Sequence, residues 1–186
     1  MKLESQQIIS DLSSQVKTLI HLGNKMQSET NKLLNTYPAD GGWNILECFE
    51  HLNRYSQFYI PEFQKTIGSA KPKQSNYYKT GFLGNYSAVQ MLPKDGVIAN
   101  KMNTFKSKDP SLSATPVGTD VIDQFLSDQN QILDVLEKAK KVDLGKNKVK
   151  TTLPLIKFKL GDALRFFLNH ELRHKVQIER VYREVK

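Results

Sequence analysis

Residues 159–181, KLGDALRFFLNHELRHKVQIERV, decide the fold class. Because each residue of a helix advances by about 100° around the axis, one face of this segment collects a defined set of side chains. They are Ala163, Phe167, His170, His174, Ile178 and Val181, with Gln177 at the edge of the face. The segment is therefore predicted to be an amphipathic helix whose core side carries two imidazoles one turn apart.

Three further segments show helical periodicity. The first covers residues 5–35 and is ended by the breakers at 37–42. The second covers 44–68, where Asn44 and Glu47 have the spacing of a capping box, and the third covers about 119–140. The fourth helix begins near Gly161 and runs almost to the C-terminus. Four amphipathic helices without clear strand alternation predict an all-α four-helix bundle.

The segment between the second and third helices, residues 69–118, lacks helical periodicity and is rich in Gly, Pro, Asn, Ser and Lys. We expect a long irregular connection there, with short helical turns such as one around Ser87–Met91. The chain of 186 residues shows no internal repeat, so a single domain over residues 1–186 is predicted.

Composition excludes several classes of protein. No apolar run approaches the roughly 20 residues of a membrane span, and the N-terminal residues mix charges and amides where a signal peptide is apolar. Cys48 is the single cysteine, which excludes an intrachain disulfide. We therefore expect a cytoplasmic protein without membrane partners.

The net charge of +8 raises the question of nucleic acid binding. Lysines gather at residues 138–150 and 65–108, but without the interleaved aromatic and arginine residues of a single-strand platform. Solvated lysine on loops is the favoured interpretation, and nucleic acid is not expected as a partner.

The histidines occupy different environments. Burying both His170 and His174 in a core costs free energy unless each finds a partner, and a shared metal ion would serve both. His51 lies at the margin of the apolar stripe of the second helix. It is either a boundary histidine or, beside the other two, a third ligand. His21 falls opposite the apolar face of the first helix and should face solvent.

Residues 170–174 also spell H-E-x-x-H, the zinc-protease motif. Such proteases usually take a third ligand from downstream of the motif helix. Only twelve residues follow His174, and none is a histidine. A third histidine must come from upstream, so a protease is disfavoured.

The stretch GGWNILECFEHLNRY at 41–55, combined with 159–181, resembles the DinB-like superfamily. The most specific features are a histidine on the second helix and H-x-x-x-H-x-x-Q on the fourth. The resemblance implies a four-helix bundle, often of up-up-down-down type and often a homodimer, with a divalent metal held by His51, His170 and His174. Characterised relatives include bacillithiol transferases and mycothiol-dependent maleylpyruvate isomerase. Lys159 stands where relatives often have a capping Thr, which leaves the helix start open by a residue or two.

Three neutral imidazoles leave coordination positions open for water or substrate, as in catalytic sites. Such a metal lowers the pKa of a bound water or thiol. Zinc or nickel suits this ligand set best, and iron, copper or manganese is also compatible.

Five nearby residues are considered for a role at the site, and three of them have two interpretations. Glu171 is either a functional residue, which orients a ligand or acts as a base, or a boundary salt-bridge partner. Gln177 either forms a hydrogen bond with bound water or ligand, or packs as an ordinary polar side chain. Gln129 interrupts the apolar stripe of the third helix and could face the same cavity. Cys48 is either a fourth ligand or a core residue. Trp43 is interpreted as a packing anchor.

Two classes of function remain open. The first is a metal-dependent thiol S-transferase or hydrolase that acts on a small molecule, for instance an anionic low-molecular-weight thiol. The second is a non-catalytic metal-binding or stress-response module that acts through its dimer surface.

Overall fold

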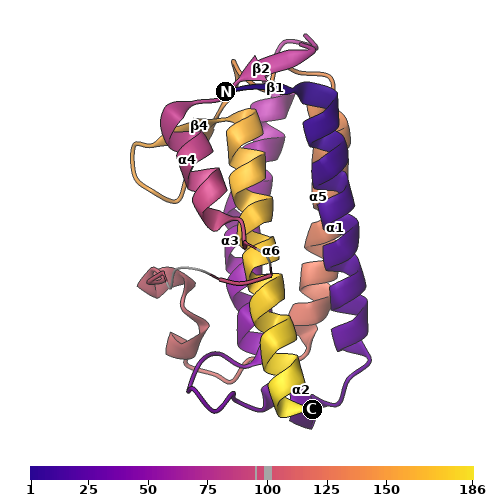
Figure 1. Ribbon diagram of the computed structural model, residues 1–186, viewed down its shortest axis with the longest axis vertical. Coiled ribbons are helices and arrows are strands. Elements are labelled where there is room, and N and C mark those ends of the chain that lie inside the picture. The colour runs from indigo at the N-terminus through magenta and orange to yellow at the C-terminus, as the bar shows by residue number, and fades with distance from the viewer. Residues whose placement is uncertain (95, 99–101) are drawn as a thin grey trace.

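The computed structural model describes residues 1–94, 96–98 and 102–186. Four long helices form a bundle (Figure 1): α1 (Ser5–Gln27), α3 (Ile45–Gly68), α5 (Asp120–Ala139) and α6 (Leu160–Val185). Apolar side chains from all four helices meet in one core. The all-α fold predicted from the periodicity is confirmed.

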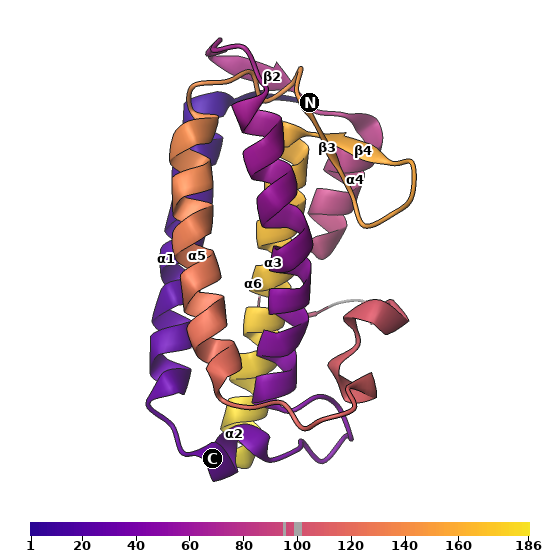
Figure 2. The ribbon, with the colours of Figure 1, turned by 180° about the vertical axis from the view of Figure 1, so that it is seen from behind.

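Helices α1 and α6 run in one direction, and α3 and α5 run in the other (Figures 1 and 2). Both α1 and α3 pack against α5 and α6. The order of directions along the chain therefore differs from the up-up-down-down arrangement that the resemblance implied. Because the neighbours α3 and α5 are parallel, the chain between them must return along the bundle, which requires the long connection.

The first predicted helix is in fact two helices, α1 and α2 (Asn31–Asn35), so the expected span of 5–35 is wrong. Ser28 closes α1. The Thr30 hydroxyl then accepts a hydrogen bond from the Leu33 amide over 3.3 Å and caps α2. A hydroxyl that satisfies the free amides of a new helix favours a break at this position.

The start of α3 is fixed by the capping box that its sequence predicts. The Asn44 side chain accepts from the Glu47 amide over 2.8 Å, and Glu47 Oε2 accepts from the Asn44 amide over 3.1 Å. The helix ends at Gly68, as expected. This cap sets the rotation of α3 and therefore the direction of His51, about two turns further on.

Two short antiparallel strand pairs, which the sequence did not predict, lie at the end of the bundle where α6 begins (Figure 1). In the first, β1 (Lys2–Glu4) pairs with β2 (Tyr77–Lys79). In the second, β3 (Lys148–Lys150) pairs with β4 (Lys157–Lys159), directly before α6.

The start of α6 is packed beneath Tyr78. A Cβ atom at Gly161 would lie 2.6 Å from Tyr78 Cζ, so only glycine fits there. Asp162 Oδ2 accepts a hydrogen bond from the Gly81 amide over 2.6 Å and ties α6 to the connection. Lys159 is the N-cap residue, but its side chain does not cap the helix. Helix α6 begins at Leu160, one residue before the expected start.

The connection between α3 and α5 is more regular than the sequence predicts. It contains α4 (Phe82–Met91) and two 3-10 turns, η1 (Lys106–Lys108) and η2 (Pro110–Leu112). Helix α4 packs along α6 through buried Gly84 and Ala88.

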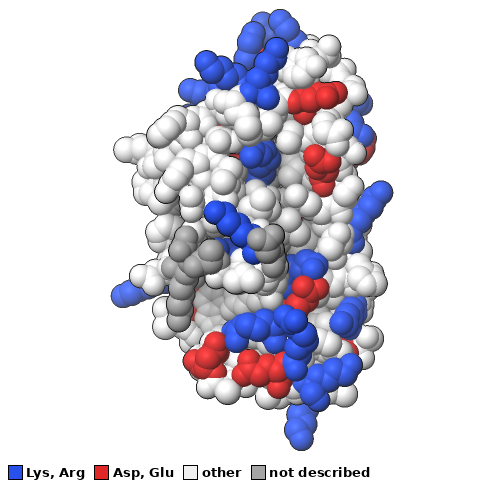
Figure 3. Space-filling model, in the orientation of Figure 1, with Lys and Arg blue, Asp and Glu red and all other residues white. Residues whose placement is uncertain are grey.

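The outer side of α4 presents large apolar side chains to solvent, namely Phe82, Leu83, Tyr86 and Val89. Figure 3 shows a largely uncharged surface over α4, with lysine and arginine beside it and toward both ends of this face. None of the helices in the described ranges is long and apolar enough to cross a membrane.

Candidate metal centre

Three histidines that are distant in sequence meet inside the bundle. His51 comes from α3, and His170 and His174 come from consecutive turns of α6. The Nε2 atom of His170 lies 3.2 Å from Nε2 of His51 and 3.2 Å from Nε2 of His174. The three residues are only 2%, 6% and 8% exposed, in the order of the chain. The structure thus brings together the histidines that the sequence singled out.

Two of these histidines are oriented by an oxygen atom at the opposite ring nitrogen. Nδ1 of His51 lies 2.8 Å from the backbone carbonyl oxygen of Lys108. Nδ1 of His174 lies 2.9 Å from Oε1 of Gln177. Because these oxygens accept hydrogen bonds, each Nδ1 carries the proton and each Nε2 keeps its lone pair. Partners of this kind fix the tautomer of metal-binding imidazoles.

Burial keeps all three imidazoles neutral. The pKa of His51 is lowered to about 4, chiefly because burial disfavours the cation. Burial also lowers the pKa of His170 and of His174 well below the ordinary value, and the neighbouring histidines add to the effect. The neutral form is the one in which imidazole binds a metal ion.

The arrangement of nitrogen atoms fits a divalent cation. One ring nitrogen from each histidine lies within 4.8 Å of the other two. A tetrahedral zinc ion with Zn–N bonds of about 2.0–2.1 Å holds its nitrogens about 3.3 Å apart, close to the two shorter separations here. Lone pairs that converge in a buried space repel one another unless a proton or a cation lies between them. The described residues contain no second group of His, Cys, Asp and Glu ligand atoms that is equally close.

Two other candidate residues lie away from this group. Cys48 is fully buried, its thiol is not among the clustered ligand atoms, and burial raises its pKa. It is therefore a core residue. His21 is exposed on α1, as predicted.

Glu171 lies in the interior of the bundle, which excludes the interpretation as a boundary salt-bridge partner. Glu171 and Gln129 are both 0% exposed, and Gln129 Nε2 donates to Glu171 Oε1 over 2.9 Å. Burial raises the pKa of Glu171 to about 8, so the carboxyl group is protonated at neutral pH. The side chain of Gln129 thus contacts Glu171, which directly follows His170 on α6.

Gln177 has a contact that sequence reasoning did not consider. Its side-chain oxygen accepts from Nδ1 of His174, which lies one turn earlier on α6. Gln177 therefore positions a histidine. The i, i+3 spacing was the available signal, because such side chains are neighbours on a helix surface.

Aromatic rings enclose the histidines. The Trp43 ring lies 4.8 Å from the His51 ring and is stacked at 6.1 Å on that of His174, measured between centroids. The Tyr55 ring lies 5.0 Å from His51 and 4.5 Å from His170. Sequence reasoning missed Tyr55, although it lies one turn after His51, and assigned Trp43 to packing alone.

Comparison with protein families agrees with this geometry. The profile of the DinB superfamily matches residues 18–178, a range that includes α3, α5 and all three histidines. The chain belongs to the DinB superfamily. Comparisons with curated proteins and with solved structures gave no match. Membership and the buried three-histidine group together fit a metal-binding protein of this superfamily.

Proposed function

We propose that this DinB-superfamily protein binds one divalent metal ion through Nε2 of His51, His170 and His174. We further propose that it is a thiol S-transferase or hydrolase for a small molecule. The observation that carries the proposal is the convergence of three neutral imidazoles, two of which are fixed with their Nε2 lone pairs free. Zinc or nickel is the proposed ion, with iron or manganese as alternatives.

The protein's own residues would prepare the site. The Lys108 carbonyl and Gln177 hold two ligands in one tautomer, and the rings of Trp43 and Tyr55 exclude water from their sides. When bound, a metal ion with three protein ligands supplies an open position and lowers the pKa of a water or thiol there.

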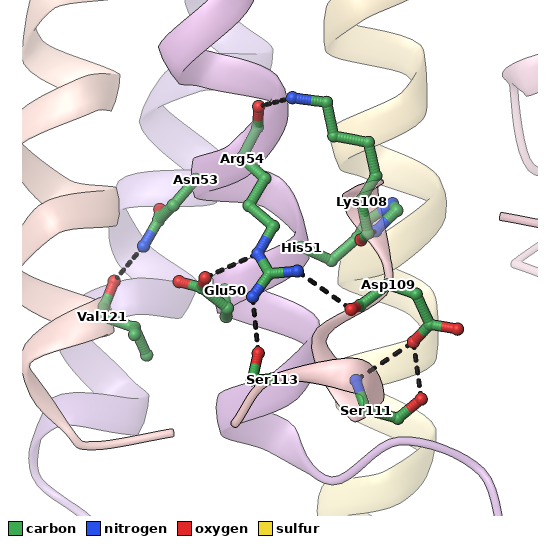
Figure 4. A network of polar contacts seen from close by, with 9 residues as sticks. All are labelled: Glu50, His51, Asn53, Arg54, Lys108, Asp109, Ser111, Ser113 and Val121. Carbon is green, nitrogen blue, oxygen red and sulfur yellow. Dashed lines mark hydrogen bonds and ion pairs between the residues drawn. The ribbon is translucent and has the colours of Figure 1, made fainter. Parts of the chain in front are cut away.

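A small anionic thiol is the substrate class that we propose. The cationic side chain of Lys108 lies beside His51, whereas the neighbouring Arg54 is ion-paired with Glu50 over 2.7 Å (Figure 4). The Lys108 ammonium group is 5.5 Å from the centre of the Tyr55 ring, which itself contacts two of the histidines. Positive charge at the edge of a site raises the local concentration of an anion.

A non-catalytic role is the second candidate, in which the metal stabilises a module that acts through a homodimer surface. The burial of all three histidines, none more than 8% exposed, favours this alternative because substrate needs access to the ion.

Cobalt(II) substitution distinguishes the two candidates. The cobalt-loaded protein is titrated with 2-mercaptoethanol and with cysteine while the visible spectrum of the ion is recorded. The enzyme proposal predicts a saturable spectral change, which reports thiol binding at an open coordination position. An unchanged spectrum of an ion that stays bound would favour the non-catalytic role, and His170→Ala controls for cobalt bound elsewhere.

A further inference from the structure

The Arg54 side chain joins the long connection to α3 next to His51 (Figure 4). Its NH1 group donates to the Asp109 carbonyl oxygen over 2.9 Å, and its NH2 group donates to Ser113 Oγ over 2.5 Å. Its Nε atom forms an ion pair with Glu50 over 2.7 Å, one turn earlier on the helix. The planar guanidinium group thus donates to Asp109 and to Ser113 at the same time. A lysine ammonium group cannot reproduce this pair of hydrogen bonds.

Lys108 directly precedes Asp109, which Arg54 contacts, and Lys108 itself contacts α3 in two ways. Its carbonyl oxygen accepts from Nδ1 of His51 over 2.8 Å. Its ammonium group donates to the backbone carbonyl of Arg54. Lys108 and Asp109 are consecutive residues. The hydrogen bond from Arg54 to the Asp109 carbonyl oxygen is therefore one peptide unit away from the Lys108 carbonyl oxygen, which orients His51.

Polar contacts supplement one buried apolar residue, Pro110, in holding residues 106–113 against α3. Phe105 and Leu112, on either side of Pro110, are 49% and 63% exposed. The segment consists of two single 3-10 turns, and Asp109 Oδ1 caps the second by accepting from the Ser111 amide over 3.0 Å. Such turns have few hydrogen bonds of their own. The position of the Lys108 carbonyl therefore depends on the links to α3.

We infer that Arg54 is a positioning residue for the three-histidine site. By holding residues 108–113 against α3, it keeps the Lys108 carbonyl on His51 Nδ1–H and directs the Nε2 lone pair of His51 toward His170. Its effect on metal affinity rests on the proposed function. Its effect on the tautomer of His51 does not require a metal.

Two measurements on Arg54→Gln test the inference. The first is zinc affinity, by competition with a chromogenic chelator. The second is the tautomer of His51 in the metal-free protein, by nitrogen-15 NMR of the imidazole ring. We expect zinc affinity to fall about 10-fold to 100-fold, as is usual when the group that orients a ligand is lost. We also expect wild type to show His51 protonated at Nδ1 alone, and the variant to show a mixture of tautomers.

Matched variants separate positioning from loss of charge. Glu50→Gln removes the ion pair but leaves the contacts of Arg54 with the segment, so wild-type affinity is expected. Arg180→Gln removes an arginine of α6 that pairs with Asp40 and Glu184, and wild-type affinity is again expected. Arg54→Lys keeps the charge and loses the planar guanidinium group, so affinity should fall.

Unchanged affinity together with an unchanged tautomer in Arg54→Gln would overturn the inference. If that variant does not fold, Arg54→Lys decides by the same two measurements. If wild-type protein binds no zinc, the proposed function fails, and the tautomer of the metal-free protein alone decides whether Arg54 positions His51.

Discussion

The Nε2 atoms of His51 and His170 lie 3.2 Å apart, although 119 residues separate them along the chain. The antiparallel packing of α3 and α6 brings them together, and an oxygen atom on the far side of His51 fixes which nitrogen keeps its lone pair. His174 adds a third ring from the next turn of α6. The apolar core thus contains a small polar site of three histidines, and the role of each residue in the site can be measured by substitution.

Gln177 should control metal affinity through His174. Replacing Gln177 with Ala removes the acceptor for Nδ1–H, so the ring loses its fixed tautomer and orientation. We expect zinc affinity to fall about 10-fold to 100-fold in a chelator competition assay. Gln177→Glu retains an acceptor and should keep wild-type affinity or exceed it. An alanine variant that binds zinc as wild type does would show that Gln177 has no positioning role.

The metal-free protein should lose stability as the pH falls below about 6.5. The pKa of each site histidine is lower in the folded protein than the ordinary 6.5, and that of His51 is about 4. Between pH 6.5 and pH 4 the unfolded chain binds more protons than the folded protein does. Stability that is present above pH 6.5 is therefore lost as the pH falls toward 4. We expect His51 to account for a loss of about 1–2 kcal/mol between pH 6.5 and 5, with His170 and His174 acting in the same direction, measured by urea unfolding.

Two histidine variants provide the comparison for this pH dependence. His170→Gln should flatten the slope of stability against pH. His21→Gln, at an exposed position on α1, is the matched control for the substitution itself. Equal slopes in wild type and His170→Gln would contradict the assignment of buried, neutral imidazoles.

Glu171 should have the opposite pH dependence. Its folded pKa of about 8 lies above the ordinary 4.5, so its contribution to stability is fully present below pH 4.5 and is lost as the pH rises through 8. A glutamine can accept from Gln129 without ionising. Glu171→Gln should therefore gain about 1–2 kcal/mol over wild type between pH 6 and 8, measured by unfolding of the metal-free protein. If the difference in free energy of unfolding between Glu171→Gln and wild type does not change with pH, the carboxyl group of Glu171 is not protonated in the core.

Trp43 should report metal binding directly. It is the single tryptophan of the chain, and its ring centroid lies 4.8 Å from that of His51. Binding of copper(II), nickel or cobalt should quench its fluorescence in proportion to occupancy, because open-shell ions quench over short distances. His174→Ala should lose this quenching at the same metal concentration. Quenching that persists in the variant would place the ion elsewhere.

Periodicity predicts the bundle because each long helix buries one apolar stripe. It also locates the site, since His170 and His174 fall at the centre of such a stripe, and the capping box at Asn44 fixes the start of α3. These features are local, and the sequence alone therefore determines them.

Other features depend on tertiary neighbours and could not be predicted in the same way. Helix α4 buries Gly84 and Ala88 and exposes its large side chains, so it has no apolar stripe to detect. The orienting partner of His51 is the backbone oxygen of Lys108, and any residue type has such an oxygen. Glu171 is buried because Gln129 of α5 meets it, a pairing that periodicity within one helix does not reveal.

Metal content tests the central claim most directly. Untagged protein is compared by mass spectrometry with His51→Ala, His170→Ala and His174→Ala, and circular dichroism confirms that each variant is helical. The three-histidine site predicts close to one ion per wild-type chain and loss of the ion in every variant. A wild-type protein that holds no ion after incubation with zinc, nickel, iron(II) and manganese, or variants that all retain it, would contradict the claim.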